Sequence, residues 1–228
     1  ADLLVLKPQR VIMTRPGDWR VLQQLKTVVE EQALTLEIRE DRHFFSTVEE
    51  FITYAKGRKS LRLEYFYRAQ RLRHHILMEN GEPEGGRWNF DEDNRKTFGA
   101  KGPGKIPTRT TFEPDPLSRD VLTLVNTRFK DHPGTLDSFA WPVTRSQALK
   151  ALRIFVKERL GLFGSYEDAM WPGEPWLYHS QLSSALNLKL ISAREVVEAV
   201  EGAYRSGLVS IQSAEGFIRQ VLGWREYV

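Results

Sequence analysis

The chain has 228 residues, with 33 lysines and arginines against 30 aspartates and glutamates and a formal net charge of +3. This length suits one large domain or two small ones, and a hydrophobic share of 41% is enough for a core. The absence of cysteine excludes disulfides and thiolate metal sites within the sequence. No apolar run approaches the roughly 20 residues of a membrane-spanning helix, and residues 1–4 (ADLL) show no signal-peptide pattern. We therefore expect a cytoplasmic protein without a membrane anchor.

The first 57 residues alternate between strand and helix patterns. The predicted elements are a strand at 10–14, a helix capped by Asp18, a strand at 35–38, and a helix that a capping box of Thr47 and Glu50 opens and Gly57 ends. Such alternation is typical of a parallel α/β sheet. Two strands are few for such a sheet, so we expect the later part of an α/β domain.

Residues 58–116 divide into a helical part and a loop-like part. A helix is predicted over 58–78, where basic residues are interleaved with Tyr65, Phe66 and Tyr67. The basic residues are Arg58, Lys59, Arg62, Arg68, Arg71 and Arg73. Two interpretations stay open for this run: a solvated helix face or a nucleic-acid surface. Residues 85–116 are rich in glycine and proline, which indicates an interdomain connection or a long ordered loop.

The rest of the chain has helical patterns throughout. Ser118 is expected to cap a helix that runs to Phe129, and Thr144 to open a helix through Leu160. Further helices are predicted over 180–188, 192–206 and 214–228. The sequence therefore predicts an α/β part followed by an all-α part.

Three segments contain candidate binding residues, each with a structural alternative. Residues 85–91 (GGRWNFD) are either a linker with docking aromatics or a loop that brings Arg87, Arg95 and Lys96 to phosphates. Residues 176–184 place hydroxyls at a predicted helix start, which suits a phosphate or a plain N-cap. Residues 216–227 form an amphipathic pattern that by itself names no reaction. The histidines have no metal-type spacing, and no metal site is predicted; they are His43, His74, His75, His132 and His179.

Taken together, these motifs resemble the photolyase and cryptochrome family. Residues 179–183 (HSQLS) are similar to the family element that wraps FAD phosphates and ribityl, and residues 224–227 (WREY) to the helix that lines the cofactor and lesion cavity. Residues 163–168 (FGSYED) resemble the element whose tyrosine touches the flavin. The stronger resemblance, through nearly the whole chain, is to the bacterial deoxyribodipyrimidine photolyase-related proteins, which include prokaryotic (6-4) photolyases. Its segments are 15–20 (RPGDWR), 57–61 (GRKSL), 64–68 (EYFYR), 85–91 and 215–220 (EGFIRQ).

The resemblance implies a domain organisation. Residues 1–57 would be the C-terminal part of a Rossmann-like, antenna-type α/β domain, and residues 58–116 a basic helix and interdomain linker. Residues 117–228 would be the first part of a helical FAD-binding domain. Family members are about twice this length, so a lumazine-type antenna pigment and a 4Fe–4S cluster are expected only in the full-length protein.

The resemblance also assigns roles to individual residues. Gln220 and Trp224 would face the lesion, and Arg87, Arg95 and Lys96 would contact the phosphates of damaged DNA. The residues implied to hold FAD are Phe163, Tyr166, His179, Ser180, Gln181, Leu182, Ser183 and Arg225.

The sequence departs from the family pattern at four positions. Phe163 stands where the family has a tyrosine, Glu167 where it has an arginine, and His179 where it has a threonine or serine. Val221 replaces a glutamate that contacts cyclobutane dimers, and its neighbour Gln220 offers an amide instead.

The implied activity is light-dependent repair, by electron transfer from FAD, of (6-4) photoproducts in the full-length protein. The piece alone is expected to be inactive. The alternatives are a cryptochrome-like photoreceptor that signals through a protein partner and a helical interaction domain without flavin.

Overall fold

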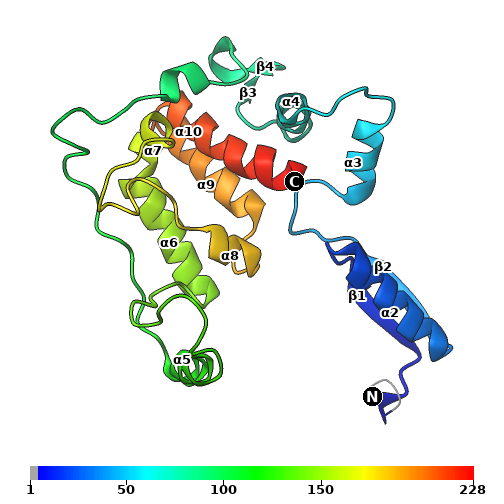
Figure 1. Ribbon diagram of the computed structural model, residues 1–228. Coiled ribbons are helices and arrows are strands. Elements are labelled where there is room, and N and C mark those ends of the chain that lie inside the picture. Colours follow the sequence, from blue (N-terminus) through cyan, green and yellow to red (C-terminus); the bar gives the residue numbers. More distant parts are fainter. Residues whose placement is uncertain (1–4) are drawn as a thin grey trace. The chain divides into compact units, whose positions relative to one another are not determined.

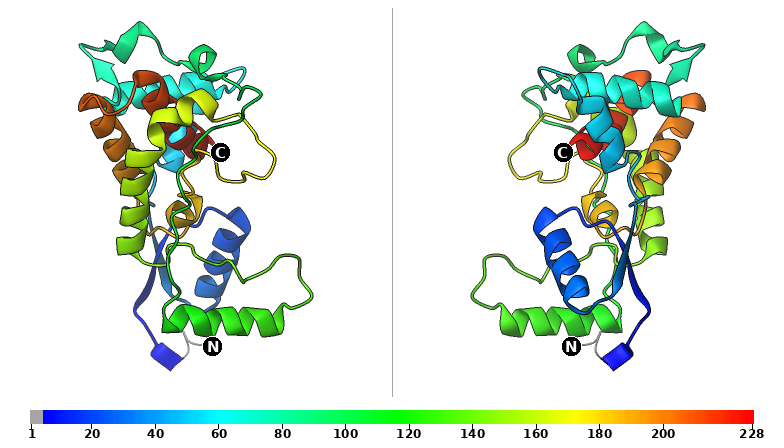
Figure 2. Two further views of the ribbon diagram at one scale, coloured as in Figure 1. Left: turned by 90° about the vertical axis from the view of Figure 1, so that its left-hand side faces the viewer. Right: turned by 90° about the vertical axis from the view of Figure 1, so that its right-hand side faces the viewer.

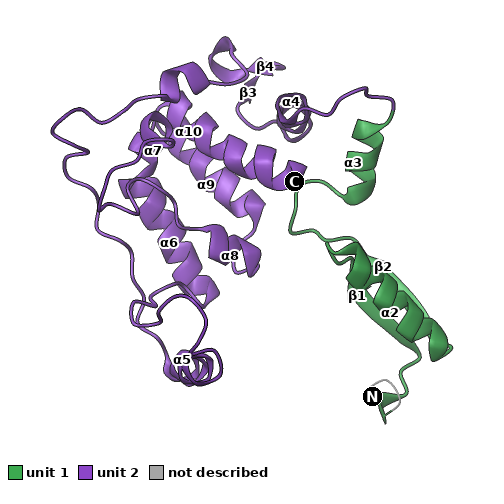
Figure 3. Ribbon diagram, viewed as in Figure 1, with its two compact units in different colours: residues 1–56 green, residues 57–228 purple. Residues whose placement is uncertain are grey.

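The computed structural model describes residues 5–228, and the chain divides into two compact units (Figure 3). Unit 1 is Ala1–Lys56 and unit 2 is Gly57–Val228. Residues 1–4, on which the expectation about a signal peptide rests, lie outside the described residues. A small sheet and many helices confirm the mixed α/β and helical composition. Among residues 5–228, no helix has the length and apolar character to cross a membrane.

Unit 1 is built around two parallel strands, β1 (Arg10–Thr14) and β2 (Thr35–Arg39), with Arg10 opposite Thr35. Helix α2 (Trp19–Glu31) connects them, and the Asp18 carboxylate caps it by accepting from the Arg20 N–H. Helix α3 (Val48–Ala55) begins with the predicted capping box. The strand–helix–strand–helix order is therefore confirmed.

Helix α4 (Leu63–His74) is shorter than the helix predicted over 58–78. Gly57 has a positive φ of 75° and Arg62 is extended, so the chain cannot begin the helix at 58. His75 adopts the left-handed conformation and ends it. The hairpin of β3 (Met78–Glu79) and β4 (Glu82–Pro83) follows. Its turn residues, Asn80 and Gly81, both have positive φ, as a two-residue hairpin turn requires.

Residues 84–115 contain two short 3₁₀ turns, η1 (Glu84–Gly86) and η2 (Asp91–Asn94), and belong to the same compact unit as the helices that follow. Helix α5 (Pro116–Arg128) begins before the predicted cap. Asp115, not Ser118, is the N-cap, because its carboxylate accepts from the Ser118 N–H and proline occupies the first helical position. Within unit 2, α5 stands apart from the other helices in the views of Figures 1 and 2.

The remaining helices also belong to unit 2 (Figure 1). They are α6 (Arg145–Glu158), α7 (Leu160–Tyr166), α8 (Ser183–Asn187), α9 (Ala193–Arg205), α10 (Ile211–Ile218), the π-helical turn η3 (Arg219–Trp224) and α11 (Arg225–Tyr227). The predicted starts of α6 and α9 are confirmed by capping boxes at Thr144 and Ser192. The helix predicted from Thr144 through Leu160 is interrupted at Arg159, which separates α6 from α7.

Two predicted helices begin elsewhere. The helix expected over 180–188 starts at Ser183, because Gln181 has a positive φ of 57° that no α-helix tolerates. The helix expected over 214–228 starts at Ile211, where the Ser210 hydroxyl accepts from the Ser213 N–H. It then runs through η3 into α11, so residues 211–227 form one rod with a π-helical section.

Candidate functional site

Two glycines allow α7 and the turn η2 to lie directly against α10. A Cβ atom on Gly164 would meet the Ser213 Cα at 2.7 Å and the Asn94 Oδ1 at 2.9 Å. A Cβ on Gly216 would meet the Asn94 Nδ2 at 2.8 Å. The Asn94 amide also donates to the Gln212 carbonyl at 3.0 Å. Only residues without a side chain permit this approach, which brings polar groups of three elements together.

The π-helical turn η3 contains two of the predicted site residues, Gln220 and Trp224. A π-turn inserts an extra residue in the helical repeat and is frequent at functional sites. Within η3, Arg219, Val221 and Leu222 are buried, whereas Gln220 is half-buried and Trp224 is 49% exposed. Of the residues in this turn, Gln220 and Trp224 are therefore less buried than Arg219, Val221 and Leu222.

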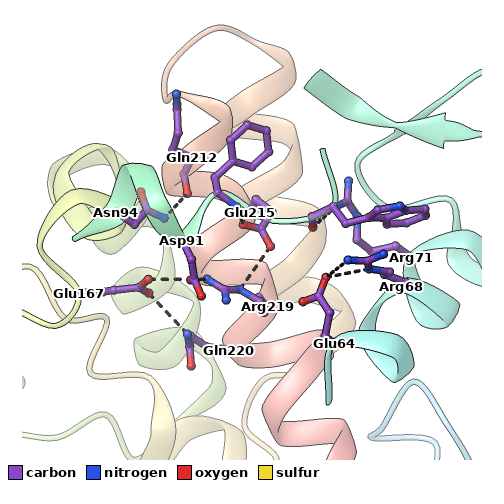
Figure 4. A network of polar contacts seen from close by, with 12 residues as sticks. Glu64, Arg68, Arg71, Asp91, Asn94, Glu167, Gln212, Glu215, Arg219 and Gln220 are labelled. Atoms are coloured by element: carbon purple, nitrogen blue, oxygen red, sulfur yellow. Dashed lines mark hydrogen bonds and ion pairs between the residues drawn. The ribbon is translucent and has the colours of Figure 1, made fainter. Parts of the chain in front are cut away.

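A cluster of polar side chains lies at this crossing (Figure 4). We call Asp91, Glu167, Glu215, Arg219 and Gln220 the polar cluster. Glu215 has no exposed surface, and its carboxylate accepts from the Phe90 N–H at 3.0 Å and faces Arg219 Nε at 3.4 Å. Arg219 also forms an ion pair with Asp91. Gln220 Nε2 donates to Glu167 Oε2 at 3.5 Å, and Glu167 Oε1 lies 3.9 Å from Arg219.

The cluster holds three carboxyl groups but only one guanidinium. The pKa values of the carboxyl groups therefore shift in different directions. Burial raises the pKa of Glu167 to about 7; Arg219 opposes this shift, and nearby carboxylates reinforce it. Burial also raises the pKa of Glu215, whereas the hydrogen bond from Arg219 lowers that of Asp91. Burial works against the Arg219 charge, but Asp91 and Glu215 more than offset it and hold its pKa above the usual value. Glu167 is thus a member of the cluster whose pKa lies near neutral pH.

Arg71 is a buried anchor rather than a surface cation. It has no exposed surface and donates to the carbonyls of Ile76, Leu77 and Trp88 at 3.2, 2.5 and 2.8 Å. Phe66 and Tyr67 are also fully buried, and Arg68 pairs with Glu64 at 2.7 Å. The basic run of 58–73 is therefore part core and part surface. Its exposed members are Arg58, Lys59, Arg62 and Arg73.

The two predicted flavin contacts on α7 lie in aromatic clusters. Phe163 is 5% exposed, edge-on to Phe217 at 5.1 Å and to His179 at 6.2 Å between ring centroids. Tyr166 stacks on Phe98 at 4.6 Å and lies 5.8 Å from Tyr178. The structure thus brings Phe163 next to His179, and Phe163 is enclosed by other rings.

The 179–183 segment forms a turn in front of α8. His179 and Ser183 are exposed, and Leu182 is buried. Ser180 and Gln181 line a cavity of about 20 Å³, beside Arg159. The buried Arg159 guanidinium donates to the carbonyls of residues 107 and 108.

These groups fit one part of FAD. Hydroxyl and amide side chains suit phosphates and ribityl hydroxyls, and the buried Ser184 Oγ has no hydrogen-bond partner in the described structure. A cavity of about 20 Å³ holds little more than a water molecule. The turn would therefore line a bound cofactor on one side only and does not enclose a space of its size.

Of the remaining predicted site residues, Arg225 contacts α8 and Arg87 contacts residues of the segment around η2. Arg225 braces α8, donating to Asn187 Oδ1 at 2.8 Å and to the Leu186 carbonyl at 3.3 Å. Arg87 pairs with Asp93 and lies 4.4 Å from the centroid of the Phe90 ring.

Arg95 and Lys96 are both exposed. The Lys96 N–H donates to the Ser165 carbonyl at 3.0 Å, which fixes the backbone beneath both cations next to α7.

Comparisons with known proteins identify the family of the chain. The family model described as deoxyribodipyrimidine photo-lyase-related protein matches residues 2–141. The chain belongs to this family. It is 41% identical over 223 residues to a (6-4) photolyase of Agrobacterium fabrum, across 98% of this chain and 44% of that protein. An uncharacterized protein of Acanthamoeba polyphaga mimivirus is 43% identical over 63 residues, across 27% of this chain and 48% of that protein. The chain thus spans about half the length of the curated relatives or less.

Arg219, Glu215 and Asp91 received no predicted role from the sequence. A signal was present for the first two. Glu215 and Arg219 are four residues apart within a mostly apolar helical run, and such a spacing places opposite charges on one face. Charged residues in an apolar run are buried only when paired, so a buried ion pair could have been predicted. Asp91 lies 128 residues from Arg219, and only the fold brings it there.

Proposed function

We propose that the full-length protein repairs UV-damaged DNA in the light, with (6-4) photoproducts as its substrate. The observation that carries this proposal is the 41% identity, over nearly the whole chain, to a protein named (6-4) photolyase. FAD, when bound, supplies the light-driven electron for such chemistry. A lumazine-type pigment and a 4Fe–4S cluster belong to the same proposal for the full-length protein, and this sequence has no cysteine to hold a cluster.

In this proposal the polar cluster forms the edge of the lesion pocket. Gln220 is half-buried and Trp224 half-exposed on the same π-helical turn, and in this proposal the amide and the indole both reach the lesion. A base taken out of the duplex is read by hydrogen bonds to its edge and by stacking. Gln220 would supply the hydrogen bonds and Trp224 the stacking surface.

In this proposal the same turn favours a (6-4) photoproduct over a cyclobutane dimer. Val221 occupies the position that the family resemblance gives to a dimer-binding glutamate, and its side chain is 4% exposed. Val221 therefore offers neither a carboxylate nor an exposed side chain to a cyclobutane dimer. An amide both donates and accepts, which suits the mixed donors and acceptors of a (6-4) photoproduct.

The other assigned residues would hold cofactor and DNA. Ser180 and Gln181 line the same small cavity, and Ser183 and His179 are exposed nearby in the sequence; in this proposal all four contact FAD. Arg87, Arg95 and Lys96 would contact phosphates, which position the duplex without reading its sequence.

The first test is to purify the full-length protein, extract its pigments and measure its dark binding to three DNA duplexes. One duplex holds a (6-4) photoproduct, one a cyclobutane dimer, and one is undamaged. We expect bound FAD and tightest binding to the (6-4) duplex. A flavoprotein that does not distinguish the duplexes would instead favour a cryptochrome-like photoreceptor, and a folded protein without flavin would contradict the proposal.

A further inference from the structure

Glu167 and Gln220 come from different elements and meet at the edge of the polar cluster (Figure 4). Glu167 follows α7, and Gln220 lies on the π-helical turn. Gln220 Nε2 lies 3.5 Å from Glu167 Oε2, and the Glu167 side chain is 9% exposed. The carboxyl group therefore holds the inner end of the amide, while the residue that carries the amide remains half-buried.

The chemistry of the two groups gives this contact two forms. An ionised carboxylate only accepts, so it holds the amide NH₂ group and leaves the amide oxygen facing outward. A protonated carboxyl group can donate to the amide oxygen instead, and a half-turn of the amide then leaves the NH₂ group outward. Gln220 thus presents an acceptor in one form and a donor in the other.

The groups around Glu167 oppose one another, so that both its ionised and its protonated form are accessible near neutral pH. Arg219, at 3.9 Å, favours the ionised form, whereas burial and the carboxylates of Asp168, Asp91 and Glu215 favour the protonated one. Arg219 is shared with Asp91 and Glu215, so it cannot fully compensate Glu167.

We propose that Glu167 is a positioning residue whose protonation state selects which end of the Gln220 amide faces the DNA lesion. The lesion part of this inference rests on the proposed function, whereas the orientation of the amide does not. Glu167 itself does not touch the lesion and acts only through Gln220. The lesion is recognised by hydrogen bonding at its base edge.

The amide is tested directly, without DNA. In the full-length protein labelled with ¹⁵N-glutamine, the side-chain resonance of Gln220, assigned with Gln220→Ala, is followed from about pH 5 to about pH 9, a range that brackets a pKa of about 7. We expect its shift to titrate near neutral pH and the titration to disappear in Glu167→Gln. The exposed Glu174 gives a matched control, and Glu174→Gln should leave the titration unchanged. A Gln220 resonance that does not titrate, or that titrates equally in Glu167→Gln, overturns the inference.

Lesion affinity is the second readout. Dark binding of the (6-4) duplex should change by up to about tenfold across the same pH range, the size of one hydrogen bond, and should be flat in Glu167→Gln. A wild-type and a Glu167→Gln profile of the same shape would overturn the lesion role of Glu167. If the wild-type protein binds no lesion at all, the proposed function fails, and with it that role, whereas the resonance measurement still decides the orientation of the amide.

Discussion

The Arg219 guanidinium forms an ion pair with the Asp91 carboxylate, so the π-helical turn is tied to a residue 128 positions earlier in the chain. Glu215 adds to this connection, because its carboxylate binds both Arg219 and the Phe90 N–H. The segment that contains the GGRWNFD motif is therefore attached to the last helix through buried charge. This attachment fixes the side of the helix from which Gln220 and Trp224 project.

Removal of Arg219 should destabilise unit 2 strongly. In Arg219→Met, Glu215 and Glu167 lose their cation while they remain buried, and breaking a buried pair costs about 3–5 kcal/mol. The free energy of unfolding in urea measures the effect. Arg153 is exposed on α6, so Arg153→Met should cost less than about 0.5 kcal/mol. Similar losses in the two variants would show that the cluster does not stabilise the fold.

The α7–α10 crossing should not tolerate a methyl group. In Gly164→Ala, the Cβ would lie 2.7 Å from the Ser213 Cα, so one backbone must move. Such overpacking costs about 1–3 kcal/mol. Gly161 lies on the same helix with nothing within 4 Å of its Cβ position, and Gly161→Ala should be neutral or stabilise by up to about 1 kcal/mol. The thermal unfolding temperatures of both variants measure these effects. A Gly164→Ala protein as stable as the wild type would contradict the close approach of α7 to α10.

Glu167 should make stability depend on pH. Its pKa is raised from 4.5 to about 7 in the folded protein, so the folded state retains a proton that the unfolded state has lost. The contribution of Glu167 to the free energy of unfolding is therefore fully present below about pH 4.5. It decreases as pH rises to about 7, by at most about 3 kcal/mol. In Glu167→Gln this decrease should be absent. Unfolding free energies at several pH values test this, and parallel curves for the two proteins would refute it.

Arg95 and Lys96 should contribute to DNA affinity through charge alone. Removing one cation that binds a phosphate should reduce the slope of log affinity against log salt by roughly 0.9. The variant with Arg95→Ala and Lys96→Ala should therefore bind all duplexes more weakly, with a shallower salt dependence. Lys150, exposed on α6, provides the control, and Lys150→Ala should keep the wild-type slope. An equal loss of affinity in both variants would mean that the interaction is not localised near η2.

Helix starts could be predicted where they depend on residues close together in the sequence. The predicted capping box at Thr47 and the predicted helix start at Thr144 were both correct, because a cap requires only residues three positions apart. The start of the helix near 118 was wrong because Asp115 and Pro116 provide a better cap than Ser118. The left-handed Gln181 could not be predicted either, since its residue type rarely adopts a positive φ.

The candidate site could be predicted only in part. The resemblance assigned Gln220 and Trp224 to the lesion side, and in the structure both lie on η3, with Trp224 exposed and Gln220 half-buried. The partners that hold this turn, Asp91 and Glu167, come from distant parts of the chain. Periodicity within one helix contains no information on such contacts. The burial of Arg71 within a basic run is equally a tertiary effect, because its three acceptors are backbone carbonyls.

Repair of a duplex that contains a single (6-4) photoproduct is the decisive test of the proposed function. The full-length protein, with its bound cofactor, is mixed with this duplex and either illuminated with blue light or kept dark, and the restored bases are quantified by chromatography. We predict restoration only in the light, and a strong reduction in Gln220→Leu. A flavin-containing protein that binds the duplex and restores no bases in the light would contradict the account.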